Sequence, residues 1–198
     1  MAYDTSRQIW TTLATRKSDL TRRVILDAAL HALERGSVDE LTVRAVAKHG
    51  NLSERTIFRY FPTREAFLDG IADEVRAQLA LPAPPATLEA ILAAPRALYA
   101  AFEAKKSLTL AALHTELFHR MRETQAKLRW KAVGKLVDSL APKKSERERR
   151  IATANIRYFL AASTWHYYRF YFGFSLEESI ACAETAIRQA LSGLGVKA

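Results

Sequence analysis

The polar side chains best suited to chemistry lie between Thr42 and Arg64. This segment combines arginines with hydroxyl-bearing residues, spaced so that several share one face of a short helix. A guanidinium group binds a phosphate or the O6 and N7 edge of guanine, and hydroxyl groups bind phosphate oxygens. The segment therefore predicts a nucleic-acid contact made by Thr42, Arg44, Ser53, Glu54, Arg55, Thr56, Arg59, Tyr60, Thr63 and Arg64.

Two short helices joined by a tight turn are expected to hold these side chains. Thr42 is the predicted N-cap of the first and Ser53 of the second, and each follows a leucine that can form a hydrophobic staple. Gly50 and Asn51 interrupt the helical pattern between them, because both tolerate a left-handed backbone. Such a helix-turn-helix fits the major groove of DNA, which is about 12 Å wide.

The remaining periodicity predicts an all-α chain. Apolar residues recur at helical spacing from Leu20 to Arg35, where Gly36 provides a stop. Further helices are predicted from Thr63 to Leu81, Thr87 to about Ala104, Ser107 to about Phe118, 119 to 141, Ser145 toward Phe172, and Ser175 to Gly193. The proline-rich segment after Leu81 is the clearest boundary, and it predicts an N-terminal domain of residues 1–80 and a C-terminal domain of residues 81–198.

Composition agrees with this fold class and with a polyanionic partner. Seven Gly and six Pro in 198 residues are too few for a turn-dense sandwich or barrel. The net charge of +9 favours nucleic acid as a partner. The single cysteine, Cys182, cannot form an internal disulfide, and no apolar run could span a bilayer, so a cytoplasmic protein without a membrane partner is expected.

Total charge does not locate the nucleic-acid face, because basic residues are in excess in two places. Through Arg64, 11 basic residues accompany seven acidic ones, and between residues 120 and 150, 11 accompany four. The basic face from Arg120 to Lys135 has two interpretations. A solvated surface is favoured, and an attraction for an anionic ligand is the alternative.

No group of residues in the sequence predicts catalytic activity, a cofactor site or a metal site. No His-x3-His pair, cysteine cluster, serine elbow or phosphate loop stands out. The histidines are scattered at His31, His49, His114, His119 and His166. We therefore expect no catalytic residues.

The sequence from Arg23 to Leu68 resembles the TetR family of bacterial transcriptional regulators. The resemblance is carried by the runs 23–29, 41–47 and 52–68, with Gly36 between the first two, and it covers about a quarter of the chain. It implies a three-helix DNA-binding head, a fourth helix that links the head to a helical ligand-binding core, and a homodimer joined through the last two helices.

Five positions depart from the usual family pattern. Gly50-Asn51 stands where Ala-Gly is common, and Phe58 stands where a tyrosine often contacts a phosphate. Thr56, Arg59 or Tyr60 would then supply that contact. Arg55 replaces a frequent glycine and could reach a guanine edge, and Arg64 replaces a frequent lysine and could hold a phosphate.

The resemblance implies a sequence-specific regulator, most simply a repressor that a small-molecule effector of unknown identity releases from double-stranded operator DNA. The alternative is a helical module that sequesters a ligand or binds a protein and keeps the head only as a scaffold. Lys17, Arg22 and Arg23 could form an arm in the minor groove, but a disordered or solvated tail is the favoured interpretation. Ile9, Trp10 and Leu13 hint at a helical extension.

Aromatic residues are concentrated near the C-terminus. Nine of the 19 lie between Tyr158 and Phe174, and they form two stripes on the expected long helix. A helix that is apolar on two sides predicts a position between a domain core and a partner. The family resemblance places a ligand pocket among the later helices, with ordinary core packing as the alternative role of its candidate residues. These candidates are Tyr99, Phe102, His114, Phe118, Trp130, Trp165 and Tyr168.

Overall fold

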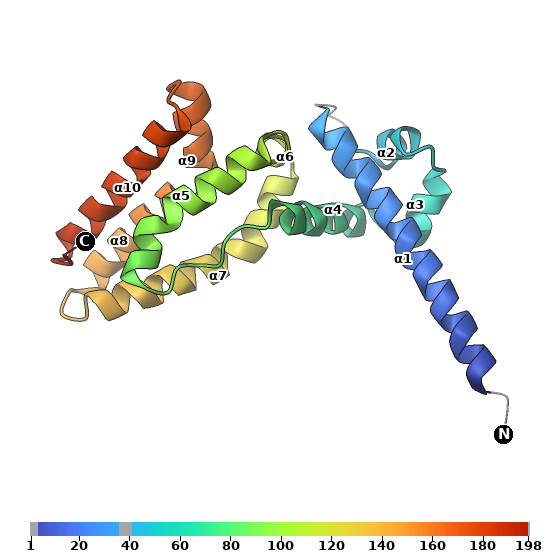
Figure 1. Ribbon diagram of the computed structural model, residues 1–198, viewed down its shortest axis with the longest axis horizontal. Helices are drawn as coiled ribbons and strands as arrows, with labels where there is room; N and C mark the ends of the chain where they lie inside the picture. Colours follow the sequence, from blue (N-terminus) through green and yellow to red (C-terminus); the bar gives the residue numbers. More distant parts are fainter. Residues whose placement is uncertain (1–3, 36–40, 198) are drawn as a thin grey trace. The chain divides into compact units, whose positions relative to one another are not determined.

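The computed structural model describes residues 4–35 and 41–197, and within these ranges the side chains of all but residues 4–14, 118 and 122–125. Every regular element in the described ranges is a helix, so the predicted all-α fold is confirmed (Figure 1). The chain divides into two compact units, Met1–Val75 and Arg76–Ala198.

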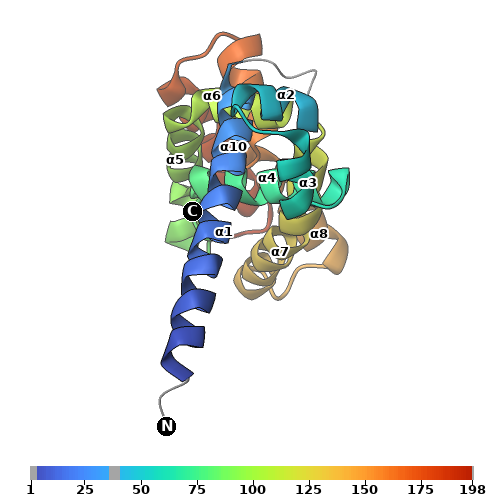
Figure 2. The same cartoon turned by 90° about the vertical axis from the view of Figure 1, so that its right-hand side faces the viewer.

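The N-terminal unit is built on one long helix. Helix α1 (Asp4–Glu34) is followed by α2 (Val43–His49), α3 (Glu54–Tyr60) and the greater part of α4 (Arg64–Leu79). Figures 1 and 2 show α2 and α3 beside the C-terminal part of α1, whose N-terminal end extends past them. The hydrophobic core of this unit draws on all four helices and includes Ile25, Ala29, Val46, Ile57 and Phe67, each fully buried.

Helix α1 begins far earlier than the predicted start at Leu20. Of the disordered or solvated tail favoured for Lys17, Arg22 and Arg23, the disordered form is wrong, because the helix continues back to Asp4 without interruption. The helical extension indicated by Ile9, Trp10 and Leu13 is confirmed. No glycine or proline stands between Asp4 and Glu34, so nothing in the backbone stops the helix. The side chains of Lys17, Arg22 and Arg23 are exposed on it.

Gly70 in α4 allows a close contact with the end of α3. A Cβ atom at Gly70 would lie 2.5 Å from Cε1 of Phe61, a buried residue. The Phe61 ring packs edge-on against Phe67, with 5.5 Å between ring centroids. Gly70 therefore sets how closely the residue that ends α3 approaches α4. Sequence reasoning missed this role, because a glycine inside a helical pattern carries no signal of what it faces.

Replacing Gly70 by alanine is expected to lower the free energy of unfolding by ~1–3 kcal/mol, because Phe61 must shift within a filled core. Gly134→Ala is the matched control. There the nearest atom to an added Cβ is Thr153 Cγ2 at 3.9 Å, so a gain of roughly 0.5–1 kcal/mol is expected from helix propensity. Urea unfolding followed by circular dichroism at one protein concentration measures both variants. Equal stabilities of the two variants would contradict the contact.

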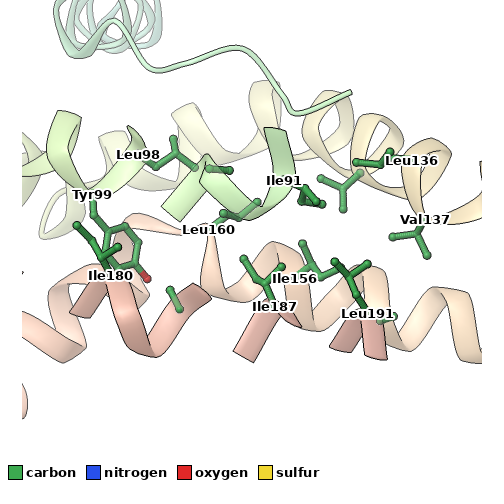
Figure 3. Close-up of a cluster of buried hydrophobic side chains, with 14 of the residues drawn as sticks. Ile91, Leu98, Tyr99, Leu136, Val137, Ile156, Leu160, Ile180, Ile187 and Leu191 are labelled. Carbon is green, nitrogen blue, oxygen red and sulfur yellow. The ribbon is translucent and has the colours of Figure 1, made fainter. Parts of the chain in front are cut away.

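The C-terminal unit contains the remaining helices. These are α5 (Leu88–Ala104), α6 (Lys106–Leu113), α7 (Leu117–Leu140), α8 (Glu146–Phe159), α9 (Ala162–His166), the π-helical η2 (Tyr167–Tyr171) and α10 (Leu176–Gly193). Helix α8 packs against α7 and α10, and α10 also packs against α5. Their apolar side chains meet in one core, to which α5 supplies Ile91 and Leu98, α8 supplies Ile156, and α10 supplies Ile187 and Leu191 (Figure 3).

Several predicted helix starts are confirmed by their hydrogen bonds. Thr87 accepts a bond from the amide of Ala90 and caps α5. Ser145 and Ser175 open α8 and α10 with complete capping boxes. In the first box, hydrogen bonds from the hydroxyl and the amide of Ser145 hold the pKa of Glu148 at about 2.

The predicted helix from Ser107 to about Phe118 begins within one residue of the observed start at Lys106, but its predicted end is wrong. Helix α6 has Lys105 as its N-cap, without a side-chain cap bond, and it ends at Leu113. The buried hydroxyl of Thr109 donates to the carbonyl groups of Phe102 and Lys105, at 3.2 and 3.0 Å. These bonds reach back seven and four residues and satisfy carbonyl groups at the end of α5, so a buried hydroxyl inside α6 makes the local hydrogen bonds at this junction in place of a side-chain cap.

The predicted long helix from Ser145 toward Phe172 is broken. Helix α8 ends at Phe159, Ala161 is extended, and α9 and η2 follow as separate elements. The half-buried Glu103 of α5 accepts hydrogen bonds from Trp165 Nε1 at 3.2 Å and from the Arg169 guanidinium. These bonds hold the segment after the break in place. Helical periodicity does not predict them, because they join residues that are far apart in the sequence.

The two predicted aromatic stripes therefore do not run along one helix. Trp165 is fully buried, whereas several of the aromatic residues are exposed. The exposed ones are Tyr158, Tyr167, Phe170, Tyr171 and Phe172.

Candidate DNA interface and effector cavity

The predicted caps of the helix-turn-helix are confirmed. The Thr42 hydroxyl oxygen accepts a hydrogen bond from the Ala45 amide at 3.1 Å, and the Ser53 oxygen accepts one from the Thr56 amide at 3.1 Å. Thr63 does the same for α4, accepting from the Ala66 amide at 3.0 Å. All three hydroxyls thus fix helix starts, and Thr42, Ser53 and Thr63 are themselves exposed.

Gly50 and Asn51 have different roles in the turn between α2 and α3. Asn51 has the left-handed backbone, with φ of 49°, while Gly50 has φ of −85°. Gly50 instead permits a close approach, since a Cβ there would lie 2.8 Å from Cβ of Ala28 in α1. The Leu52 amide then donates to the Ala47 carbonyl at 2.8 Å. This departure from the family pattern is compatible with the turn, because asparagine is among the residues that adopt αL.

Helix α3 presents its polar face to solvent. Ile57 on its inner side is fully buried, which fixes the orientation of the seven-residue helix. Glu54, Arg55 and Arg59 are exposed, and Thr56 is half-buried with its hydroxyl 2.8 Å from that of Ser53. Beyond α3, Arg44 of α2 and Arg64 of α4 are exposed as well. Phe58 is 45% exposed, so an apolar ring also lies on the outer surface.

Tyr60 connects the end of α3 to α1. Its hydrogen bond with Thr21 lowers the pKa of the Tyr60 hydroxyl, with smaller contributions from Arg59 and Ser18. The Arg59 guanidinium carbon lies 5.1 Å from the centroid of the Tyr60 ring. Tyr60 thus has a structural role that the sequence did not reveal, in addition to any contact with a phosphate.

Helix α1 contributes cations beside this end of α3. The Arg22 guanidinium lies over the ring of Phe61, 5.0 Å from its centroid. Lys17 and Arg23 are exposed on the same helix. Since the sequence analysis favoured a tail here, it missed a basic helical surface. The available signal was the uninterrupted run without glycine or proline.

A cavity of about 1040 Å³ lies within the C-terminal unit. Its wall is formed by residues of α5 to α9, by the last turn of α4 and by Ala80 and Leu81. Phe102 and Trp130 are the two predicted ligand residues that line it. The volume is at the upper end of the range for drug-sized ligands.

The other predicted ligand residues lie elsewhere. Tyr99 and Trp165 belong to the fully buried core, and Tyr168 packs against that core. His114 faces His166, with 5.1 Å between ring centroids, and burial lowers the pKa of His166. The side chain of Phe118 lies outside the described residues.

The described part of the chain offers little for other chemistry. No group of three or more His, Cys, Asp or Glu side chains there could hold a metal ion. None of the helices in that part is both long and apolar enough to cross a bilayer.

Comparison with known proteins points to one class. Residues 25–71, which include the whole helix-turn-helix, match the family described as "Bacterial regulatory proteins, tetR family". The fold is similar to that of NalD from Pseudomonas aeruginosa, described as the secondary repressor of the MexAB-OprM multidrug efflux pump. The TM-score is 0.57 at 15% identity, over 89% of this chain and 96% of NalD. No curated protein matches the sequence.

The capped helix-turn-helix and its exposed arginines lie within the segment that matches this family of bacterial regulatory proteins. The N-terminal part of the chain thus matches the tetR family of bacterial regulatory proteins.

Proposed function

We propose that the protein is a homodimeric repressor that binds a palindromic operator and is released from it by a small molecule. In this proposal residues 1–80 form the DNA-binding head with its linker helix, and residues 81–198 bind the effector and join the two subunits. The protein would act in the cytoplasm, where the chromosome lies. The observation that carries the proposal is the exposed, arginine-rich face of α3 opposite the buried Ile57.

The roles of the individual head residues follow from chemistry and position. Arg55 and Thr56, in the first turn of α3, would contact base edges, since the N-terminal residues of a recognition helix do so. Phosphates would be held from the surrounding helix ends. The phosphate-contacting set is Thr42, Arg44, Ser53, Arg59, Tyr60, Thr63 and Arg64, while Glu54 would accept from a cytosine amino group or select against other bases.

Dimerisation would present two copies of α3 to successive major grooves, about 34–36 Å apart or at a related spacing. We assign the interface to α8 and α10, following the family pattern. Ile151 on α8 is 51% exposed, and α10 carries exposed small residues such as Ala181 and Ser192. An apolar residue and small side chains together suit close helix packing between subunits.

Effector binding would act through α4. This helix carries Arg64 in its first turn, and with Arg76 and Leu79 in its last turn it lines the cavity. A ligand that binds more tightly to one position of α4 than to another would shift the population of head positions, and DNA affinity would change with it.

A gel-shift titration of the protein against DNA from upstream of its own gene tests the proposal. We expect retention at low salt that weakens steeply as salt rises, because bound arginines release counterions. A folded dimer that retains no DNA at low salt would contradict it. That outcome would favour the alternative, a ligand-sequestering or protein-binding module without DNA affinity.

A further inference from the structure

The charges around the cavity are all of one sign. Among its described lining residues, five carry a positive charge and none carries a negative charge. Three of the cations come from α7, and one each from α4 and α8. They are Arg76, Lys127, Arg129, Lys131 and Arg157.

Arg129 is the cation most strongly affected by its position. Partial burial lowers the pKa of Arg129, and none of the described carboxylates offsets this effect. Its partner within the described part of the chain is neutral, the Pro82 carbonyl, to which Nη2 donates at 3.2 Å. Two other half-buried arginines of this unit differ, since Arg169 pairs with Glu103 at 2.9 Å and Arg149 with Asp138 at 2.8 Å.

A partly buried guanidinium without a counter-charge is unfavourable, since burial removes hydration that no carboxylate replaces. An anion in the cavity would supply the missing charge and accept hydrogen bonds from the remaining guanidinium donors. The rest of the wall would exclude a small inorganic ion as the best occupant, because most of it is apolar. Leu98, Phe102, Leu113, Trp130 and Leu160 contribute to this apolar wall.

We propose that the cavity binds an amphipathic anion, a molecule with a bulky apolar body and one carboxylate or phosphate group held by Arg129. This proposal deepens the effector role assigned above and depends on that cavity being the effector site. It also assigns part of the basic run from Arg120 to Lys135 to ligand binding. A fully solvated surface was the interpretation favoured by the sequence.

The test is a calorimetric titration of the full-length protein, without DNA, with four ten-carbon probes below their micellar concentrations. These are decanoate, decyl phosphate, decanol and decyltrimethylammonium. One of the two anions is expected to bind about 10-fold or more tightly than the alcohol, as a charge-assisted hydrogen bond would give, and the cation more weakly still. Whichever anion binds better identifies the head group. Equal or tighter binding of the alcohol or the cation would overturn the proposal.

Variants locate the anion within the cavity. Arg129→Gln keeps a donor for the Pro82 carbonyl but removes the charge, and it is expected to weaken anion binding about 10-fold while leaving decanol binding unchanged. Lys131→Gln, at an exposed lining residue, should weaken anion binding less than Arg129→Gln does. It replaces Arg129→Gln in the test if that variant does not fold. Lys135→Gln is the matched control, since Lys135 is exposed on the same helix and does not line the cavity. Equal affinities in the lining variants and this control would overturn the assignment.

The outcome is separable from that of the proposed function. Anion binding that leaves the operator complex intact would support the ligand class and contradict release by an effector. Salt-dependent operator binding by a protein that shows no preference for the anions would contradict the ligand class alone.

Discussion

Operator affinity is expected to fall roughly 5- to 150-fold when Arg55 is replaced by alanine, which corresponds to ~1–3 kcal/mol for a bidentate contact with guanine. Arg55 is exposed in the first turn of α3, and the buried Ile57 fixes which way that turn faces. Because a base contact carries sequence information, the variant should also lose preference for the operator over unrelated DNA. Fluorescence anisotropy with both DNAs at one salt concentration measures the affinity and the ratio.

Arg64 provides the contrast to Arg55. We expect Arg64→Ala to weaken binding to all sequences alike and to reduce the slope of log affinity against log salt by about 1, as loss of one phosphate contact would. Lys143→Ala, which removes one exposed charge from the C-terminal unit, controls for net charge. A change of sequence preference in Arg64→Ala, or none in Arg55→Ala, would show that these roles are assigned wrongly.

Trp165→Ala is expected to destabilise the protein by ~3–5 kcal/mol, the range for removal of a large aromatic side chain from a core. Trp165 is fully buried, and its ring centroid lies 5.8 Å from that of Phe102 and 5.5 Å from that of Phe170. The substitution also removes the Nε1 donor to Glu103, which is half-buried and retains its pair with Arg169. Urea unfolding at a fixed protein concentration measures the loss, since the proposed dimerisation would make stability depend on concentration.

Trp130→Ala is the control for this effect. Trp130 is 40% exposed and lines the cavity rather than the core, so a loss of about 1 kcal/mol, the usual value for a point substitution, is expected. Similar losses from the two tryptophan substitutions would contradict the distinction between core and cavity that the structure draws.

The sequence alone was sufficient to predict the fold class, the helix-turn-helix and most helix starts. The caps at Thr42, Ser53 and Thr87, and the boxes at Ser145 and Ser175, were all found in the structure. A cap is a contact between residues three positions apart, so both partners can be recognised in a short stretch of sequence. The DNA-binding class was predictable for the same reason, because its residues lie in one continuous segment.

Tertiary structure decided whatever depends on residues far apart in the chain. The break after Phe159 is stabilised by Glu103, which accepts hydrogen bonds from Trp165 and Arg169. A ligand pocket was expected from the family resemblance, with mostly aromatic candidates for its lining, yet Tyr99 and Trp165 fill the core while Arg129 lines the cavity. Burial depends on which helices pack together. Periodicity along one helix indicates the face on which a side chain lies, but not which other residues it contacts.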